Sequence, residues 1–187
     1  MNVFGYPITY FEFFGVLVDF LSIYFAAKIN VWTWSTGIVS SILFFILYFS
    51  THTYANAILQ IIFVVISING WLKWGKENSK KVTNLKKRNI LYLFGISIVS
   101  IIFFGHINSY SSNLYPYLDT SIFILSIIAT ILLANKKIES WFFWIAVNII
   151  SIILYSSFGY YLICIQCVIF IIIDIFALKE WNKNLIK

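Results

Sequence analysis

The chain has 187 residues, of which 61% are hydrophobic and 11% are charged. Soluble domains carry about 25% charged residues, so one soluble core would not bury this much apolar surface. The net charge of +6 accompanies several apolar runs of membrane length, which indicates a membrane orientation signal rather than a nucleic-acid partner. We therefore expect an all-α protein that crosses the lipid bilayer several times.

The apolar runs predict seven transmembrane helices, because about 20 apolar residues are needed to cross the hydrocarbon core. The predicted spans are residues 7–27, 32–50, 53–71, 89–105, 118–135, 140–157 and 159–178. The first span is not expected to be a signal peptide. It contains Glu12 and Asp19, follows no basic region, and ends at Lys28 without a small-residue cleavage site.

The positions of the 13 Lys and Arg residues predict the orientation. These residues lie at position 28, between 73 and 88, at 136–137, and between 179 and 187. With seven crossings, all of these segments fall on one side, and the opposite connections contain no Lys or Arg. Since basic loops remain in the cytoplasm, we expect the N-terminus outside and the C-terminus in the cytoplasm.

Spans one to three resemble spans five to seven, with span four left over. At a shift of 107 residues the matches are Glu12 with Asp119, Ala27 with Ala134, Trp34 with Trp141, Ser41 with Asn148 and Tyr48 with Tyr155, and at a shift of 106 they are Tyr54 with Tyr160 and Gln60 with Gln166. Chance agreement is the alternative. The matches predict two parallel three-helix repeats (residues 1–72 and 107–187) joined by a basic loop and a linker helix (residues 73–106). This arrangement resembles the SWEET sugar transporters, and parallel repeats of this kind place the substrate site at the repeat interface.

One helix face in residues 140–157 combines indole rings with polar groups. Trp141, Trp144, Asn148, Ser151 and Tyr155 share this face at helical spacing. Such a face suits a flat solute that forms hydrogen bonds. However, all seven tryptophans lie at cytoplasmic ends of the predicted spans, so anchoring at the membrane interface is the alternative. Trp144 lies one turn deeper than Trp141 and shares its face with Asn148, which lies near mid-membrane, so these two residues favour binding most.

Further polar side chains lie within the spans. Asp19 and Asp174 are intramembrane carboxylates, which cost on the order of 3 kcal/mol or more at the bilayer centre and are functional by default. Asp174 is about one turn from its predicted cytoplasmic end, which favours a structural role. For Gln60, the alternative to ligand binding is a helix–helix hydrogen bond of roughly 0.6–2 kcal/mol. The secondary or gating candidates are Asp19, Ser41, Trp71 and Gln166.

No pattern of catalytic or metal-binding residues is present in the sequence. Cys164 and Cys167 form a CxxC inside an apolar helix, without further cysteines or a nearby histidine, so we interpret them as small buried residues. His52 and His106 lie in outer loops without catalytic spacing. We therefore expect a protein that is not an enzyme and that holds no cofactor and no metal. An enzyme would require the two histidines to meet in space.

Two tryptophan motifs resemble those of the PnuC family of bacterial vitamin transporters. Residues 69–74 (NGWLKW) are similar to the family's GWxxW, and residues 139–144 (ESWFFW), followed by Asn148, are similar to its ExWxxW. The likeness extends over nearly the whole chain. It implies a SWEET-like homotrimer in the bacterial inner membrane that takes up a vitamin by facilitated diffusion, with trapping through phosphorylation by a cytoplasmic kinase.

The resemblance also implies a substrate site in which Trp141 and Trp144 flank the vitamin ring. Asn148 and Gln60 would supply hydrogen bonds, and Tyr155 lies on the same face. Nicotinamide riboside fits because its pyridinium ring gains about 0.5–2 kcal/mol over an indole, and Asn148 resembles the branch that carries it. Thiamine and riboflavin remain open as substrates. A proton-coupled carrier that uses Asp19 and a membrane partner without transport activity remain open as functions.

Overall fold

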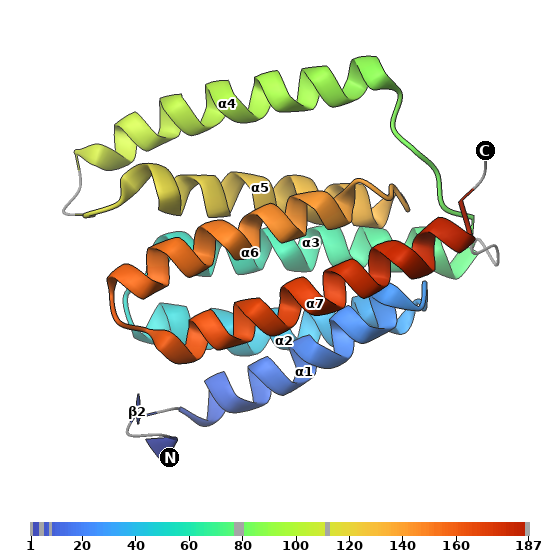
Figure 1. Ribbon diagram of the computed structural model, residues 1–187. Coiled ribbons are helices and arrows are strands. Elements are labelled where there is room, and N and C mark those ends of the chain that lie inside the picture. The colour runs from blue at the N-terminus through green and yellow to red at the C-terminus, as the bar shows by residue number, and fades with distance from the viewer. Residues whose placement is uncertain (1, 4–5, 8, 77–80, 111–112, 186–187) are drawn as a thin grey trace. The chain divides into compact units, whose positions relative to one another are not determined.

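In the computed structural model, residues 2–3, 6–7, 9–76, 81–110 and 113–185 are described. This part of the chain forms seven helices, each long and apolar enough to cross a membrane, which confirms the predicted all-α membrane protein (Figure 1). The helices are α1 (Tyr10–Ala27), α2 (Trp32–Ser50), α3 (Tyr54–Lys76), α4 (Lys87–Ser109), α5 (Pro116–Ala134), α6 (Ser140–Ser157) and α7 (Tyr161–Lys183). Ahead of α1, the short strands β1 (Asn2–Val3) and β2 (Tyr6–Pro7) form an antiparallel pair.

Three helices are longer than their hydropathy indicates, and α4 extends from Lys87 to Ser109 where residues 89–105 were predicted. The ends of α3 and α7 lie five residues beyond the predicted boundaries, at Lys76 and Lys183. Lysines in these last turns interact favourably with the helix dipole and reach polar surroundings through their long stems. As a result, about two and a half turns, roughly 13 Å of helix, separate Asp174 from the end of α7. Asp174 therefore lies deeper in its helix than the predicted boundary at residue 178 indicated.

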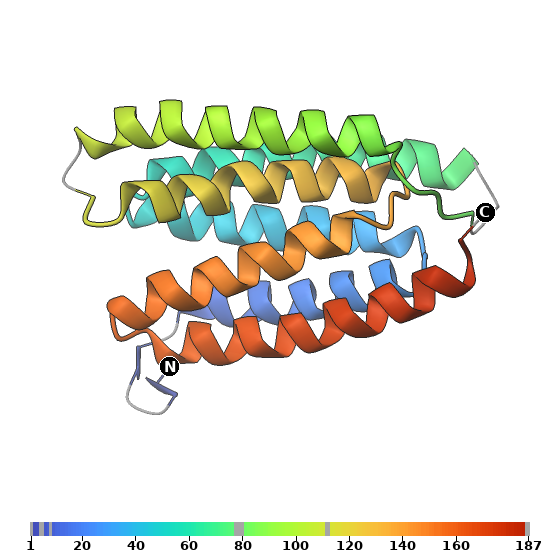
Figure 2. The same cartoon turned by 45° about the horizontal axis from the view of Figure 1, so that its top comes forward.

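The chain divides into two compact units, residues 1–80 and 81–187. In the first unit, α2 packs against both α1 and α3. In the second, α6 packs against both α5 and α7, while α4 packs along α5 (Figures 1 and 2). Both units thus contain three consecutive helices whose middle member contacts the other two. The three-part division with α4 as a linker and the parallel-repeat relation remain predictions.

Buried indole rings hold the first unit together where α2 meets α3. The Trp34 ring is 2% exposed and meets Trp74 edge-on, with ring centroids 5.2 Å apart. Gly70 makes this packing possible, since a Cβ atom there would lie 2.5 Å from Cε2 of Trp34. Between α1 and α2, the hydroxyls of Ser22 and Thr33 each donate to the other's backbone carbonyl at 2.9 Å. Small polar residues of this kind let membrane helices approach closely.

The second unit repeats the indole contact at the equivalent positions. Trp141 of α6 meets Trp181 of α7 edge-on, with ring centroids 5.3 Å apart and an interplanar angle of 89°. A shift of 107 residues relates this pair to Trp34 and Trp74. Ala177 occupies the position that matches Gly70 and is fully buried. The same local packing in both units supports the repeat hypothesis.

Residues 81–86, which we call the basic strap, are tied to one end of the second unit. Thr83 donates its backbone N–H to Lys136 O at 3.1 Å and accepts from Ile138 N at 3.2 Å. The N–H of Val82 donates to Asn184 O at 3.1 Å, and that of Leu85 donates to Glu139 Oε1 at 2.8 Å. The strap therefore links the entry of α4 to the α5–α6 connection and to the segment after α7 (Figure 1).

Candidate functional site

The predicted polar face of α6 is turned into the second unit. Trp141 is 1% exposed, and Asn148 and Ser151 are each 6% exposed, whereas Trp144 and Tyr155 are half-buried. These side chains face inward because α6 lies between α5 and α7, so its apolar remainder covers the outer side. The five side chains that helical spacing grouped on one face of α6 are therefore all buried or half-buried in the structure.

Asn148 is joined to the acidic residue of the next helix. Its Nδ2 donates to Asp174 Oδ2 at 3.0 Å, and both side chains are buried. This is the one side-chain hydrogen bond that either residue makes with the described residues. Because the N–H of Asn148 faces Asp174, the carbonyl oxygen of the same amide is directed away from it. The pair is a polar centre between α6 and α7 in an apolar region.

The register of the α6–α7 hairpin determines this pairing. Asn148 and Asp174 are equidistant from residue 161, and so are Trp141 and Trp181. In an antiparallel helical hairpin, residues at equal distances from the turn lie at the same level. The sequence therefore contained a signal for the pairing, which the separate assessment of Asn148 and Asp174 missed.

Trp141 occupies a packing position. Its ring is enclosed against Trp181, and its indole N–H has no hydrogen-bond partner in the described part of the chain. The expectation that it flanks a substrate ring stays a prediction. Trp144 lies one turn further along α6 and is half-buried, so its ring retains an accessible surface. Trp144 and Asn148 are about 6 Å apart along the helix axis, within reach of one small ligand.

Tyr155 lies too far along α6 to share that ligand with Trp141. Fourteen residues separate them, which corresponds to about 21 Å of helix. The ring centroids of Tyr155 and Tyr160 are 6.5 Å apart. The hydroxyl of Tyr155 interacts electrostatically with Asp119 of α5. Asn113 Nδ2 donates to the same carboxylate at 3.3 Å. Tyr155 thus belongs to a polar cluster at the opposite end of α6.

The remaining candidates are spread over other helices. In the first unit, Gln60 and Ser41 are buried, and neither side chain has a hydrogen-bond partner among the described residues. Asp19 is half-buried on α1, and the hydroxyl of the nearby Ser40 of α2 donates to Gly15 O at 3.2 Å. Gln166 is half-buried on α7 of the second unit. The structure describes each unit by itself, so Gln60 is not placed relative to the α6 residues.

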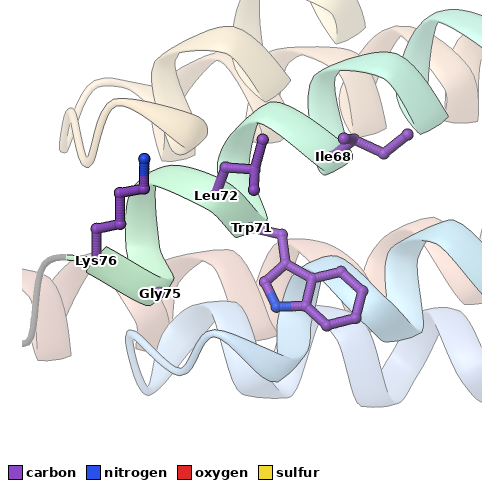
Figure 3. A pocket seen from close by; sticks show the side chains of 5 residues that line it. All are labelled: Ile68, Trp71, Leu72, Gly75 and Lys76. Atoms are coloured by element: carbon purple, nitrogen blue, oxygen red, sulfur yellow. The ribbon is translucent and has the colours of Figure 1, made fainter.

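Trp71 lines a shallow groove of about 300 Å³ on one stretch of α3 (Figure 3). The other lining residues are Ile68, Leu72, Gly75 and Lys76, all from the same helix. Trp71 is 45% exposed. An apolar surface that ends at a lysine suits contact with lipid chains and headgroups, so this groove lacks the converging polar groups of a solute site.

Among the described residues, no group of three or more His, Cys, Asp or Glu side chains is placed to hold a metal ion. Cys167 is buried, and the Cys164 Sγ lies 3.7 Å from the carbonyl oxygen of Ile152 in α6. These contacts fit the interpretation of both cysteines as packing residues of α7. The polar chemistry of the second unit is therefore concentrated in Asn148 and Asp174.

A comparison with family models decides the kind of protein that carries this arrangement. The model described as nicotinamide mononucleotide transporter matches residues 9–183. The chain belongs to the nicotinamide mononucleotide transporter family. The expected PnuC-type vitamin transporter is thereby confirmed, and the protein is not an enzyme. With seven membrane-length helices, this family member is a multi-pass protein of the bacterial inner membrane.

Named relatives of this transporter cover almost the whole chain. The nicotinamide riboside transporter PnuC of Escherichia coli (strain K12) is 24% identical over an alignment 210 residues long. This alignment covers 96% of this chain and 88% of the relative. The riboflavin/roseoflavin transporter RibM of Streptomyces davaonensis is 21% identical and is matched over 87% of its length. The crystal structure of the vitamin B3 transporter PnuC superposes with a TM-score of 0.76 at 20% identity, covering 91% of this chain and 79% of that one. That structure supports the fold.

Proposed function

We propose that this vitamin transporter takes up nicotinamide riboside. The observation that carries the proposal is the buried Asn148–Asp174 pair beside the half-buried ring of Trp144. The relative from Escherichia coli is named for the same substrate, which supports the choice. A pyridinium ring over the indole of Trp144 gains about 0.5–2 kcal/mol, and the negative charge of Asp174 favours the same cation.

The amide of Asn148 supplies a hydrogen-bond acceptor for the vitamin. Its carbonyl oxygen is free to accept from a carboxamide or a ribose hydroxyl, because its N–H is engaged by Asp174. We propose that Gln60 is also a ligand-binding amide, since it is buried and has no partner in the described part of the chain. Trp141 supports this site by holding α6 against Trp181 of α7. We propose that Tyr155 acts at the opposite end of α6 rather than on the same ligand group.

Two other vitamins are alternative substrates. Thiamine is also a flat aromatic cation, so Trp144 and Asp174 suit it on the same grounds. Riboflavin is favoured by the likeness to the riboflavin/roseoflavin transporter RibM. A panel of nicotinamide riboside, nicotinamide, thiamine and riboflavin in a thermal-shift assay separates them. We expect nicotinamide riboside to give the largest stabilisation of the purified protein, and a larger shift with another vitamin would reassign the substrate.

Transport is tested by counterflow in proteoliposomes. We expect labelled nicotinamide riboside to exchange across the membrane without an imposed gradient, because the proposed mechanism is facilitated diffusion with trapping by a cytoplasmic kinase. Absence of exchange would favour a membrane partner without transport. Accumulation driven by an imposed pH gradient, lost in Asp19→Asn, would instead favour proton coupling through the half-buried Asp19.

The site is tested by a pair of tryptophan substitutions. Trp144→Ala should weaken nicotinamide riboside binding about tenfold or more, which corresponds to the ~1.4 kcal/mol of a good ring contact. Trp32→Ala is the matched control, because Trp32 is 60% exposed at the start of α2. Its affinity should stay within about twofold of wild type. Equal losses in both variants would indicate an interfacial anchor role and refute the ring site.

We further propose an extracellular N-terminus, a cytoplasmic C-terminus and a homotrimeric assembly. The orientation is supported by the basic residues, which all lie at one set of alternating helix ends. A C-terminal fusion to a fluorescent protein should therefore fluoresce, whereas a fusion to alkaline phosphatase should be inactive. The trimer is supported by the resemblance to the PnuC family. Light scattering of the detergent complex should give the mass of three chains.

A further inference from the structure

We propose that Asp174 is a specificity-determining residue of the transporter. By fixing the orientation of the Asn148 amide and contributing a negative charge, it selects a ligand that presents a hydrogen-bond donor and a positive charge. It thereby excludes the carboxylate analogue of the same vitamin. This inference rests on the proposed function and specifies the ligand chemistry of its site.

The first step is the orientation of Asn148. An amide side chain offers a donor at one end and an acceptor at the other, and which end faces the ligand depends on its protein partner. Here the partner is a carboxylate, and Nδ2 lies 3.0 Å from Asp174 Oδ2. The amide therefore presents its carbonyl oxygen to the opposite side. A ligand group that meets this oxygen must donate a hydrogen bond.

The second step is the lack of other partners. Asn148 is 6% exposed and Asp174 is 2% exposed, yet neither side chain makes a further hydrogen bond with the described residues. Buried polar atoms are nearly always paired in native proteins. The carbonyl oxygen of Asn148 and the second carboxylate oxygen of Asp174 have no partner among the described residues, and neither is one of the fully enclosed polar atoms that lack a partner. Both acceptors are therefore open to a ligand that supplies donors.

The third step is the charge of Asp174. It forms no ion pair with any described residue, although the chain carries an excess of basic side chains. Those basic side chains lie at the helix ends, whereas Asp174 lies about two and a half turns from the end of α7. An uncompensated carboxylate within a membrane helix is costly, and a cationic ligand would offset that cost.

The first unit shows that the fold does not require this pair. At the shift of 107 residues that also relates the two indole pairs, the matching positions carry Ser41 and Ser67, which are both buried. Two hydroxyls therefore suffice to pack the equivalent helices. The amide and the carboxylate of the second unit add directionality and charge that this packing does not need, as expected for residues that select a ligand.

The test compares three ligands of nearly equal shape on the detergent-purified full-length protein. Nicotinamide riboside is cationic and carries a donor amide, its dihydro form is neutral with the same amide, and nicotinic acid riboside presents a carboxylate that only accepts. For wild type we expect nicotinamide riboside to bind about 100-fold more tightly than the acid, because unpaired polar groups reject analogues strongly. We expect the neutral form to bind with intermediate affinity.

In Asp174→Asn the preference for nicotinamide riboside over the acid should fall about tenfold or more, since Asn148 is then free to turn its N–H toward the ligand. Glu180→Gln is the matched control, because it removes a carboxylate of the same helix that pairs with Lys183 at 2.9 Å outside the proposed site, and it should leave the ratio unchanged. A purely structural hydrogen bond between α6 and α7 predicts equal losses for all three ligands, and that result would overturn the inference.

Wild type alone also provides a test if Asp174→Asn does not fold. Equal affinity of wild type for nicotinamide riboside and its acid overturns the inference and leaves the proposed function standing. Failure of wild type to bind nicotinamide riboside, thiamine or riboflavin overturns the proposed function itself. The two failures are therefore distinct.

Discussion

The substitution Gly70→Ala tests the indole packing that the two units share. Gly70 lies on α3, where the ring of Trp34 from α2 rests directly on its backbone. An added Cβ atom would lie 2.5, 2.6 and 2.7 Å from three carbons of that ring. Carbon atoms normally pack at 3.5–4.0 Å, so the overlap is about 1 Å. The ring has little freedom to retreat, because Trp34 is 2% exposed and Trp74 lies edge-on at 5.2 Å.

The expected loss of stability follows from two opposing terms. Overpacking of a well-filled core costs about 1–3 kcal/mol. The higher helix propensity of alanine returns up to about 1 kcal/mol. An overlap of about 1 Å against an enclosed ring belongs to the upper part of the overpacking range, about 2–3 kcal/mol. The net loss is then about 1–3 kcal/mol, which for a chain of 150–250 residues lowers the melting temperature by about 2–12 °C.

The measurement is thermal unfolding of the detergent-solubilised protein, followed by size-exclusion chromatography with fluorescence detection. Gly75→Ala on the same helix is the matched control, because a Cβ atom there would meet nothing within 4 Å. This variant should be as stable as wild type or slightly more stable. Trp34→Phe in the Gly70→Ala background should recover part of the loss, since contacting residues couple by about 0.5–3 kcal/mol. A melting temperature of Gly70→Ala equal to that of wild type would refute the packing argument.

Three further predictions separate structural from functional side chains. Trp141→Ala should cost about 3–5 kcal/mol of packing free energy and so lower the melting temperature strongly. Trp144→Ala should instead lower nicotinamide riboside affinity with little change in melting temperature. The reverse pattern would contradict both assignments. Glu139→Ala removes the carboxylate oxygen that accepts from Leu85 N at 2.8 Å, and the lost hydrogen bond should cost about 1–3 kcal/mol of stability. Trypsin should then cleave the basic strap faster. An unchanged cleavage rate would argue against the strap contact. Lys183→Ala breaks an exposed ion pair of 2.9 Å on α7 and should change stability by less than about 1 kcal/mol, so a larger loss in thermal unfolding would show that the pair is not a simple surface contact.

The helices themselves are determined by the sequence. In lipid, a spanning segment must form its backbone hydrogen bonds within itself, and a helix does so. Each apolar run is long enough for one such helix, so hydropathy locates all seven. The positions of α2 and α6 agree with the prediction at both ends. The inward face of α6 was also predictable, because Trp141, Asn148 and Ser151 follow helical spacing. These features depend on residues that are close together in the chain.

The tertiary structure decided which of the predicted side chains act together. Trp141 and Trp144 look alike in the sequence, yet Trp141 is enclosed by Trp181 while Trp144 remains half-buried. Asp174 proved to be the partner of Asn148, and this contact depends on the register of the α6–α7 hairpin. Hydropathy and helical spacing describe each helix by itself. The level at which two helices meet is determined by their turn and by packing between residues far apart in the chain, such as the 26 positions that separate Asn148 from Asp174.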